Sequence, residues 1–209
     1  MPEQPILKIN EIFWSFQGEG LRAGVPSIFL RLAGCSLKCP YCDTKYAWDR
    51  GRWTPLPEIL DAIDKQKKKY PASQVVITGG EPLEQNLTDL ITALKSRDYF
   101  IAIETNGVEY ADLAIDWWTV SPKDVSGYFI NKGLIKRIDE IKLIVNENLT
   151  IEVIKKIRAI GDYFTIFLQP ESNDNHKYEN TFYLFEQCQL EGIANVRPGI
   201  QLHKVYKVM

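Results

Sequence analysis

Three of the four cysteines, Cys35, Cys39 and Cys42, crowd into one short segment with the spacing C-x3-C-x2-C. Cysteine thiolates are soft ligands for zinc and for iron–sulfur clusters, and a trio this close cannot pair entirely as disulfides. Structural zinc needs four protein ligands, so Asp43 or a distant histidine would have to complete such a site. An iron–sulfur cube held by three cysteines leaves one iron open to a further ligand, which fits the spacing better. Cys188 stands apart and is expected to be an ordinary buried thiol.

Polar and glycine-rich motifs follow the expected strands at several other places along the chain. They occupy residues 17–20 (QGEG), 79–82 (GGEP), 104–107 (ETNG), 121–123 (SPK), 169–172 (QPES) and 203–204 (HK). Taken singly, each motif is more typical of a turn or a strand end than of a site. In a parallel α/β sheet or barrel, however, the carboxyl ends of the strands form the edge where ligands bind. Together the motifs therefore predict one shared cavity.

Apolar strand-like runs alternate with segments of helical period, which predicts parallel strands joined by right-handed crossovers. Proline tolerates a first helical turn, and Asn86 and Thr150 are expected to cap their helices, with Gly161 ending the second. We expect strands at 9–13, 28–32, 75–78, 100–103, 117–120, 141–145 and 164–168 and near Ile200. Helices are expected from 54–57 into the lysine run 65–69 and at 86–97, 150–160 and 178–190. Between the strands at 100–103 and 117–120 we expect only a short segment, at 110–115, where a longer helix would otherwise stand.

Length and composition predict one globular domain spanning residues 1–209, because the chain has 45% hydrophobic residues and no repeat or linker. Its net charge is −2, and the basic run 65–69 (KQKKK) suits the negative end of a helix dipole, so no nucleic-acid partner is expected. There is no apolar stretch of membrane-spanning length and no charged-then-apolar leader at the first residues. We therefore expect a cytoplasmic protein without a membrane partner.

The segment from Cys35 to Cys42 resembles the cluster motif of the radical S-adenosylmethionine (SAM) superfamily, in which three cysteines bind a 4Fe-4S cluster. Further motifs, in chain order, resemble the 7-carboxy-7-deazaguanine synthase family of that superfamily. They are residues 11–20 (EIFWSFQGEG), 29–35 (FLRLAGC), 42–44 (CDT), 103–107 (IETNG), 120–123 (VSPK), 168–170 (LQP) and 201–204 (QLHK). The order of the motifs is more specific than any one of them.

The resemblance implies a fold, a reaction and a set of partners. The fold would be an incomplete parallel β/α barrel with a modified cluster loop. The reaction would be the ring contraction of 6-carboxy-5,6,7,8-tetrahydropterin to 7-carboxy-7-deazaguanine with loss of ammonia, a lyase step toward queuosine and other 7-deazapurines. A 5'-deoxyadenosyl radical from SAM would take hydrogen from the pterin, with Mg2+ assisting the ring contraction. An electron donor such as flavodoxin or ferredoxin and a homodimer are also implied.

The resemblance assigns roles to individual residues as well. The 4Fe-4S ligands would be Cys35, Cys39 and Cys42, and the Mg2+ ligand would be Thr44. SAM would be bound by Tyr41, Gly80, Ser121, Pro122, Lys123, Gln169, Pro170, Glu171 and Ser172. The substrate would be bound by Phe16, Gln17, Gly18, Glu19, Arg31, Thr78, Glu104, Asn106, His203 and Met209, the last standing where relatives often end in proline.

Ordinary structural roles stand beside these assignments. The planar fork of Arg31 suits the substrate carboxylate, but the same side chain could form a surface ion pair. A lone histidine such as His203 is more often structural than catalytic. Two alternative functions also stay open: a glycyl-radical enzyme activase, which shares the cluster motif, and a non-catalytic zinc-binding adaptor. The two proposed pterin motifs, 17–20 and 104–107, argue against the activase.

Overall fold

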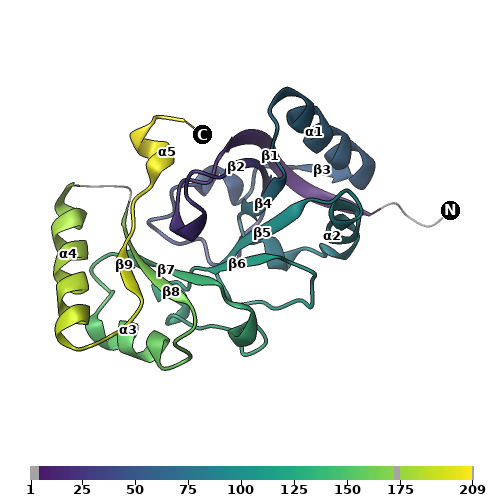
Figure 1. The fold of residues 1–209 in the computed structure, drawn as a ribbon. Helices are drawn as coiled ribbons and strands as arrows, with labels where there is room; N and C mark the ends of the chain where they lie inside the picture. The colour runs from purple at the N-terminus through teal and green to yellow at the C-terminus, as the bar shows by residue number, and fades with distance from the viewer. Residues whose placement is uncertain (1–4, 172–174, 209) are drawn as a thin grey trace.

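The computed structural model describes the backbone of residues 5–171 and 175–208 and the side chains of residues 5–171 and 178–208. Two residues that were predicted to bind ligands, Ser172 for SAM and Met209 for the substrate, therefore lie outside the described residues. The strands form one nine-stranded sheet in the order β3-β1-β2-β4-β5-β6-β7-β8-β9 (Figure 1). The strands are β1 (Ile6–Phe16), β2 (Pro26–Leu32), β3 (Arg52–Pro55), β4 (Gln74–Gly79), β5 (Phe100–Thr105), β6 (Trp117–Val120), β7 (Glu140–Val145), β8 (Thr165–Pro170) and β9 (Val196–Pro198).

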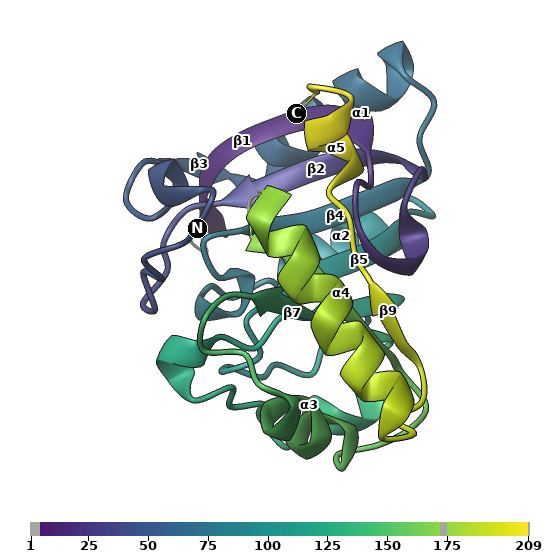
Figure 2. The same cartoon turned by 90° about the vertical axis from the view of Figure 1, so that its left-hand side faces the viewer.

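The sheet is parallel from β2 to β9, and β1 pairs antiparallel with both β2 and β3. It is not closed, since β3 and β9 are its two ends. The predicted incomplete β/α barrel is thereby confirmed. The helices are α1 (Leu56–Lys69), α2 (Thr88–Lys95), α3 (Ile151–Arg158), α4 (Asn175–Leu190) and α5 (Leu202–Val205). Helix α4 packs against β8 and β9. Figure 2 shows α4 beside β9 and α5 near β1 and β2.

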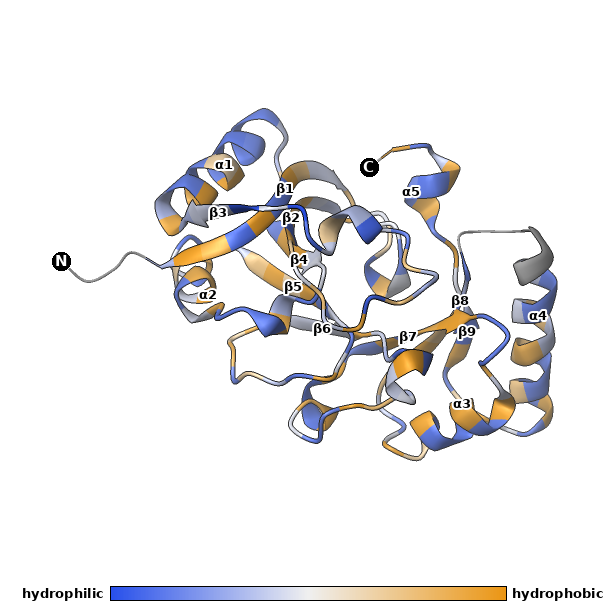
Figure 3. Ribbon diagram, turned by 180° about the vertical axis from the view of Figure 1, so that it is seen from behind, coloured by the Kyte–Doolittle hydropathy of each residue, from blue (hydrophilic) through white to orange (hydrophobic). Residues whose placement is uncertain are grey.

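Side chains alternate between the two faces of each strand, and this alternation separates core from cavity. Ile28, Leu30 and Leu32 of β2 face the helices and join the main apolar core, together with Ile77 of β4. The residues between them, including Phe29, face the other way into the barrel. Figure 3 shows the result by hydropathy, with apolar colouring along the strands and mixed colouring on the outer helices.

Most predicted elements are confirmed within a few residues. Helix α1 begins at Leu56 with Pro57 in its first turn and ends in the lysine run. The side chain of Thr150 caps α3, accepting a hydrogen bond from the N–H of Val153. Asn86, by contrast, stands one residue before the N-cap of α2, although its Oδ1 accepts from the N–H of Thr88 at 3.1 Å.

Three local predictions are wrong. The segment 110–115 has no regular structure, because so short a segment does not offset the cost of nucleating a helix. The last strand ends at Pro198, two residues before Ile200, although the N–H of Gly199 still donates to the carbonyl of Leu168 at 2.7 Å. The edge strand β3 was not expected, because its four residues carry too little apolar periodicity to be recognised. In the part of the chain that the structure describes, no helix is long and apolar enough to cross a membrane.

Candidate functional site

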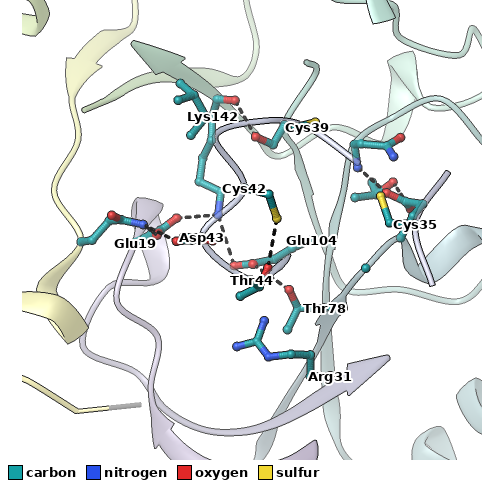
Figure 4. A pocket seen from close by; sticks show the side chains of 18 of the residues that line it. Glu19, Arg31, Cys35, Cys39, Cys42, Asp43, Thr44, Thr78, Glu104 and Lys142 are labelled. Carbon is teal, nitrogen blue, oxygen red and sulfur yellow. Dashed lines mark hydrogen bonds and ion pairs between the residues drawn. The ribbon is translucent and has the colours of Figure 1, made fainter. Parts of the chain in front are cut away.

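A cavity of about 240 Å³ opens at the carboxyl ends of the strands, where the motifs were predicted to meet. Most of the predicted site residues border it: Phe16, Gln17, Gly18, Glu19, Arg31, Cys35, Cys39, Tyr41, Cys42, Thr44, Thr78, Gly80, Glu104, Asn106, Ser121, Lys123, Pro170, Glu171 and His203. Pro122 and Gln169 are not among the lining residues. Residues from both ends of the chain therefore share one cavity. Figure 4 shows the labelled lining side chains from Glu19 to Lys142.

The cluster loop follows β2 and is held by backbone contacts with the end of β4. The N–H of Gly80 donates to the carbonyl of Leu32 at 3.0 Å, and the N–H of Glu81 donates to that of Gly34 at 2.7 Å. A Cβ atom on Gly80 would lie 1.7 Å from the carbonyl oxygen of Gly34. Glycine is thus required at this position by the approach of the two backbones, whether or not Gly80 also contacts SAM.

The three cysteines of the cluster loop border the same cavity, Cys39 being buried and Cys35 and Cys42 half-buried. Burial raises the pKa of the Cys35 and Cys39 thiols, and Lys123 opposes this shift at Cys39. A cationic group that binds thiolates would reverse the cost of ionising them. Within the described residues, no three His, Cys, Asp or Glu side chains are arranged around a single ion. A cube is different, because each cysteine binds a different iron, and the three thiols fit that donor set.

Thr44 and Tyr41 flank the third cysteine. The Oγ1 of Thr44 lies 3.5 Å from the Sγ of Cys42 and faces the cavity. The hydroxyl of Tyr41 donates to Asp124 on the turn after β6, whose other carboxylate oxygen accepts from Asn148 Nδ2 at 2.6 Å. The cluster loop is therefore tied through Tyr41 to the turn that follows Ser121 and Lys123.

Strand register brings Arg31, Thr78 and Glu104 side by side on the cavity face. Arg31 of β2 lies opposite Thr78 of β4. Ile77 of β4 pairs with Ile103 of β5, so the residues that follow them, Thr78 and Glu104, are neighbours on the two strands. Glu104 accepts hydrogen bonds from Gln17 Nε2 at 3.0 Å and Thr78 Oγ1 at 3.1 Å. The Nε of Arg31 pairs with Glu11 at 2.7 Å. The ion-pair alternative for Arg31 is thus present in the structure, while the rest of its guanidinium borders the cavity (Figure 4).

Lys142 of β7 is a charged residue of the cavity that the motifs did not predict. Its Nζ lies 2.6 Å from Glu19 Oε2 and 3.4 Å from Glu104 Oε1. Burial opposes the ionisation of Glu104, but Lys142 and the bonds from Gln17 and Thr78 outweigh it and lower the pKa of that carboxyl. The sequence signal was available: a lysine within the apolar run of a central strand is almost never buried without a partner.

A short C-terminal segment closes the cavity opposite the strands. The N–H of Leu202 donates to the carbonyl of Gly18 at 2.9 Å, and a Cβ on Gly18 would lie 2.2 Å from Nδ1 of His203. Burial lowers the pKa of His203, although Glu19 opposes that shift. Gln201, which was noted only as part of motif 201–204 and given no role, borders the cavity as well.

Gln201 and Lys204 connect the closing segment to two other parts of the site. Gln201 Nε2 donates to Glu19 Oε1 at 2.7 Å. Lys204 Nζ pairs with Asp43 at 3.0 Å, and Gln201 Nε2 lies 3.4 Å from the same carboxylate. Asp43, considered above as a fourth zinc ligand, is thus engaged with the closing segment.

The remaining predicted residues are turn residues around the cavity. Ser121 donates to the carbonyl of Lys142 at 3.0 Å and accepts from Lys123 Nζ at 2.7 Å. Asn106 Oδ1 accepts from the N–H of Val108 at 2.8 Å. The side chain of Gln169 is buried beside Gly199, and its Nε2 has no hydrogen-bond partner among the described residues.

Comparisons with known proteins connect this geometry to a family. The model of the radical SAM superfamily matches residues 30–197. A 7-carboxy-7-deazaguanine synthase from Aquifex aeolicus is 34% identical over 96% of this chain and 94% of its own length. One from Bacteroides thetaiotaomicron is 40% identical over 80% of this chain and 84% of its own. The chain belongs to the 7-carboxy-7-deazaguanine synthase family of the radical SAM superfamily.

The solved structures agree with this family membership. The crystal structure of QueE from Escherichia coli superposes with a TM-score of 0.78, at 31% identity, and covers 95% of each chain. Membership of the radical SAM superfamily means that a 4Fe-4S cluster and SAM are the cofactors. The matches favour the synthase family over the activase and the zinc adaptor, because they extend over nearly the whole chain rather than the cluster motif alone.

Proposed function

We propose that the protein is a lyase that converts 6-carboxy-5,6,7,8-tetrahydropterin to 7-carboxy-7-deazaguanine with loss of ammonia. The observation that carries the proposal is the shared cavity, in which the cluster cysteines and the polar residues Arg31 and Glu104 face one another. Relatives named 7-carboxy-7-deazaguanine synthase are similar to nearly the full length of this chain. The product is a precursor of queuosine and other 7-deazapurines.

Cys35, Cys39 and Cys42 would hold the 4Fe-4S cluster. When bound, the cluster and SAM together supply the 5'-deoxyadenosyl radical. Around them the chain provides Tyr41, Gly80, Ser121, Pro122, Lys123, Gln169, Pro170 and Glu171 as the SAM contacts. The tie between Tyr41 and Asp124 supports this assignment, because it fixes the aromatic ring next to the turn that bears Ser121 and Lys123.

The pterin would lie against β2, β4 and β5. Arg31 would bind its carboxylate with the part of the guanidinium that Glu11 leaves free, since a guanidinium offers five donors. Glu104 and Glu19 would accept from the ring N–H and amino groups. Gln17 and Thr78, which donate hydrogen bonds to Glu104, would bind the substrate as well, together with Gly18 and Asn106. Phe16 would contact the ring face and His203 would close the cavity from the other side. Removing water from this cavity strengthens each of these polar contacts.

Mg2+, the reductant, the oligomer and the location complete the proposal. Thr44 would be a hard oxygen ligand for Mg2+, which keeps waters or substrate oxygens as its other ligands. The reductant would be a flavodoxin or ferredoxin. Exposed apolar side chains on α4 and at the end of α5, including Phe182, Tyr183 and Val205, support a homodimer. We propose one catalytic domain across residues 1–209, active in the cytoplasm.

The test is an anaerobic assay after cluster reconstitution. The protein is incubated with dithionite, SAM, Mg2+ and 6-carboxytetrahydropterin, and 7-carboxy-7-deazaguanine is sought by mass spectrometry. We expect product from the wild type and from Cys188→Ala, but none from Cys39→Ala. If 5'-deoxyadenosine forms without the deazaguanine, the substrate assignment fails. Omitting Mg2+ and measuring mass by light scattering test the metal and the dimer separately.

A further inference from the structure

Lys142 places one buried cation between two carboxylates from distant parts of the chain. Its side chain is 9% exposed, and its Nζ contacts Glu19 at 2.6 Å and Glu104 at 3.4 Å. Glu19 follows β1, whereas Glu104 lies on β5. Figure 4 shows the side chain extending into the cavity toward both carboxylates. Lys142 therefore joins the two groups that would accept hydrogen bonds from the pterin ring.

The other cations near the cavity have their own partners. Arg31 pairs with Glu11, Lys204 with Asp43, and Lys123 donates to Ser121. Among the described residues, only Lys142 forms ion pairs with both Glu19 and Glu104. The charged and titratable groups that act on Lys142 or on Glu104 from all surrounding elements are Glu19, Arg31, Asp43, Lys123, Glu140 and His203.

A second residue of β7 also contacts the loop after β1. Glu140, two residues earlier on the same face, is buried and accepts from the N–H of Leu21 at 2.7 Å and from Thr119 Oγ1 at 2.9 Å. The strand therefore contacts the loop after β1 at two points: Glu140 accepts a hydrogen bond from Leu21, and Lys142 forms an ion pair with Glu19. Such a double attachment fixes where the Glu19 carboxylate lies.

A cavity that holds two carboxylates close together without a cation is unfavourable. The charges repel, and burial penalises each of them, so that one carboxyl takes up a proton. A protonated carboxyl presents an O–H donor where an acceptor is needed for a ring N–H. A buried ammonium between the two groups removes both problems, because it attracts each of them and occupies the space between them.

We propose that Lys142 is a positioning residue that holds Glu19 and Glu104 as paired acceptors for the N–H edge of the pterin ring. This inference rests on the proposed function and names the device behind its substrate recognition. Ligands with a 2-amino-4-oxo pyrimidine edge satisfy both carboxylates, whereas ring systems without these donors leave a charged acceptor unpaired. The positive charge at Lys142 is therefore part of the specificity for guanine-like rings.

The test compares Lys142→Met with Lys142→Arg, which keeps the charge, and with Lys136→Met, which removes an exposed lysine elsewhere. Infrared difference spectra between about pH 6 and pH 8.5, the range in which buried carboxyls of raised pKa titrate, are recorded before cluster loading. We expect a new carboxylic-acid carbonyl band in Lys142→Met that disappears when Glu104→Gln is added. Lys142→Arg and Lys136→Met retain the wild-type spectrum. This readout needs no turnover, so it stands even if the proposed substrate is wrong.

Kinetics give the second readout. In Lys142→Met we expect the KM for the pterin to rise about 10- to 100-fold, which corresponds to the loss of one charge-assisted hydrogen bond. This KM should decrease again as the pH increases, because Glu104 then ionises. In the control Lys136→Met, the KM for the pterin and the cleavage of SAM without substrate are unchanged. Failure of the wild type to make deazaguanine would refute the proposed function and leave the infrared result to decide about Lys142.

Two results would overturn the inference. One is a Lys142→Met protein with the wild-type infrared spectrum and pH profile. The other is a Lys142→Arg protein as impaired as Lys142→Met without a new band, because shape rather than charge would then matter. If Lys142→Met does not fold by circular dichroism, Lys142→Gln takes its place with the same expected outcomes.

Discussion

The two sides of the cavity are held in different ways. The strand side consists of Arg31, Thr78 and Glu104, which project from paired strands over the main apolar core. The closing segment, residues 201–206, is held by a backbone hydrogen bond to Gly18, by polar contacts of Gln201 and Lys204, and by the edge-on contact of the Tyr206 ring with Phe16. A strand cannot shift without breaking its ladder and core contacts, whereas the closing segment has few contacts to lose.

This difference shows which side of the cavity is already ordered before ligands bind. The strand side and the cluster loop attached to it are fixed by folding, so changes to the backbone contacts and thiols that hold them should act on stability or on the cofactors. The closing segment is fixed by a few side-chain contacts and one backbone hydrogen bond to Gly18, so changes there should act on substrate affinity. The predictions below test this division, beginning with the largest expected effect.

Cys39→Ser should abolish turnover, because the serine hydroxyl does not replace a thiolate as a ligand of iron. We expect a lower iron content after reconstitution and no 5'-deoxyadenosine. The matched control is Cys188→Ser, which alters a fully buried thiol of α4 far from the cavity. Equal iron and activity in the two variants would contradict the assignment of Cys39.

Gly80→Ala should destabilise the strand side by at least about 3 kcal/mol, since overpacking against a backbone has no flexible side chain to relieve it. The new Cβ would lie 1.7 Å from the Gly34 carbonyl oxygen. At roughly 2–4 °C per kcal/mol, Tm should fall by roughly 6–12 °C. Gly127→Ala is the control, since its Cβ meets no atom within 4 Å and only its φ of +63° opposes alanine. That strain costs about 1 kcal/mol, and an equal loss in both variants would refute the steric argument.

Glu81 should make the stability of the strand side depend on pH. Its fully buried carboxyl accepts from Thr105 Oγ1 at 2.6 Å and from the N–H of Asn106 at 2.7 Å, yet burial raises its pKa from 4.5 to about 7. Between these two values the folded chain keeps a proton that the unfolded chain has lost. The free energy of unfolding should therefore decrease as pH rises through this window and level off above it.

Denaturant titrations across this pH window check the expectation. At about 1.4 kcal/mol per unit of pKa difference, the change should amount to a few kcal/mol. Glu81→Gln should flatten the profile, whereas the exposed Glu147→Gln should retain the wild-type slope. An unchanged slope in Glu81→Gln would show that another group titrates.

Lys204→Met should give the smallest effect. Its ion pair with Asp43 is half-exposed, at 30% and 43% for the two side chains, and such pairs contribute at most about 1 kcal/mol. We expect the KM for the pterin to rise by at most about fivefold, with kcat and Tm unchanged. The exposed Lys207 supplies a control, Lys207→Met. A fall in Tm as large as that of Gly80→Ala would remove the distinction between the two sides.

The sequence predicted most of the strands because their apolar runs are long enough to be read without tertiary context. It failed at β3 and at residues 110–115, where short segments take their conformation from their neighbours. The cluster loop was predictable, since the spacing of its cysteines is specific in itself. Lys142 was missed, because its role depends on Glu19 and Glu104, which approach it only when β7 takes its place in the sheet.

The cofactor chemistry, the order of the motifs along the strands and the family follow from the amino-acid sequence, because spacing and order are properties of the chain. The ion pairs of Lys142 with Glu19 and Glu104, of Arg31 with Glu11 and of Lys204 with Asp43 became visible only in the folded protein. These pairs join residues far apart in the chain. Their existence depends on strand register and on burial, which set both the distances between the charges and the strength of their interaction.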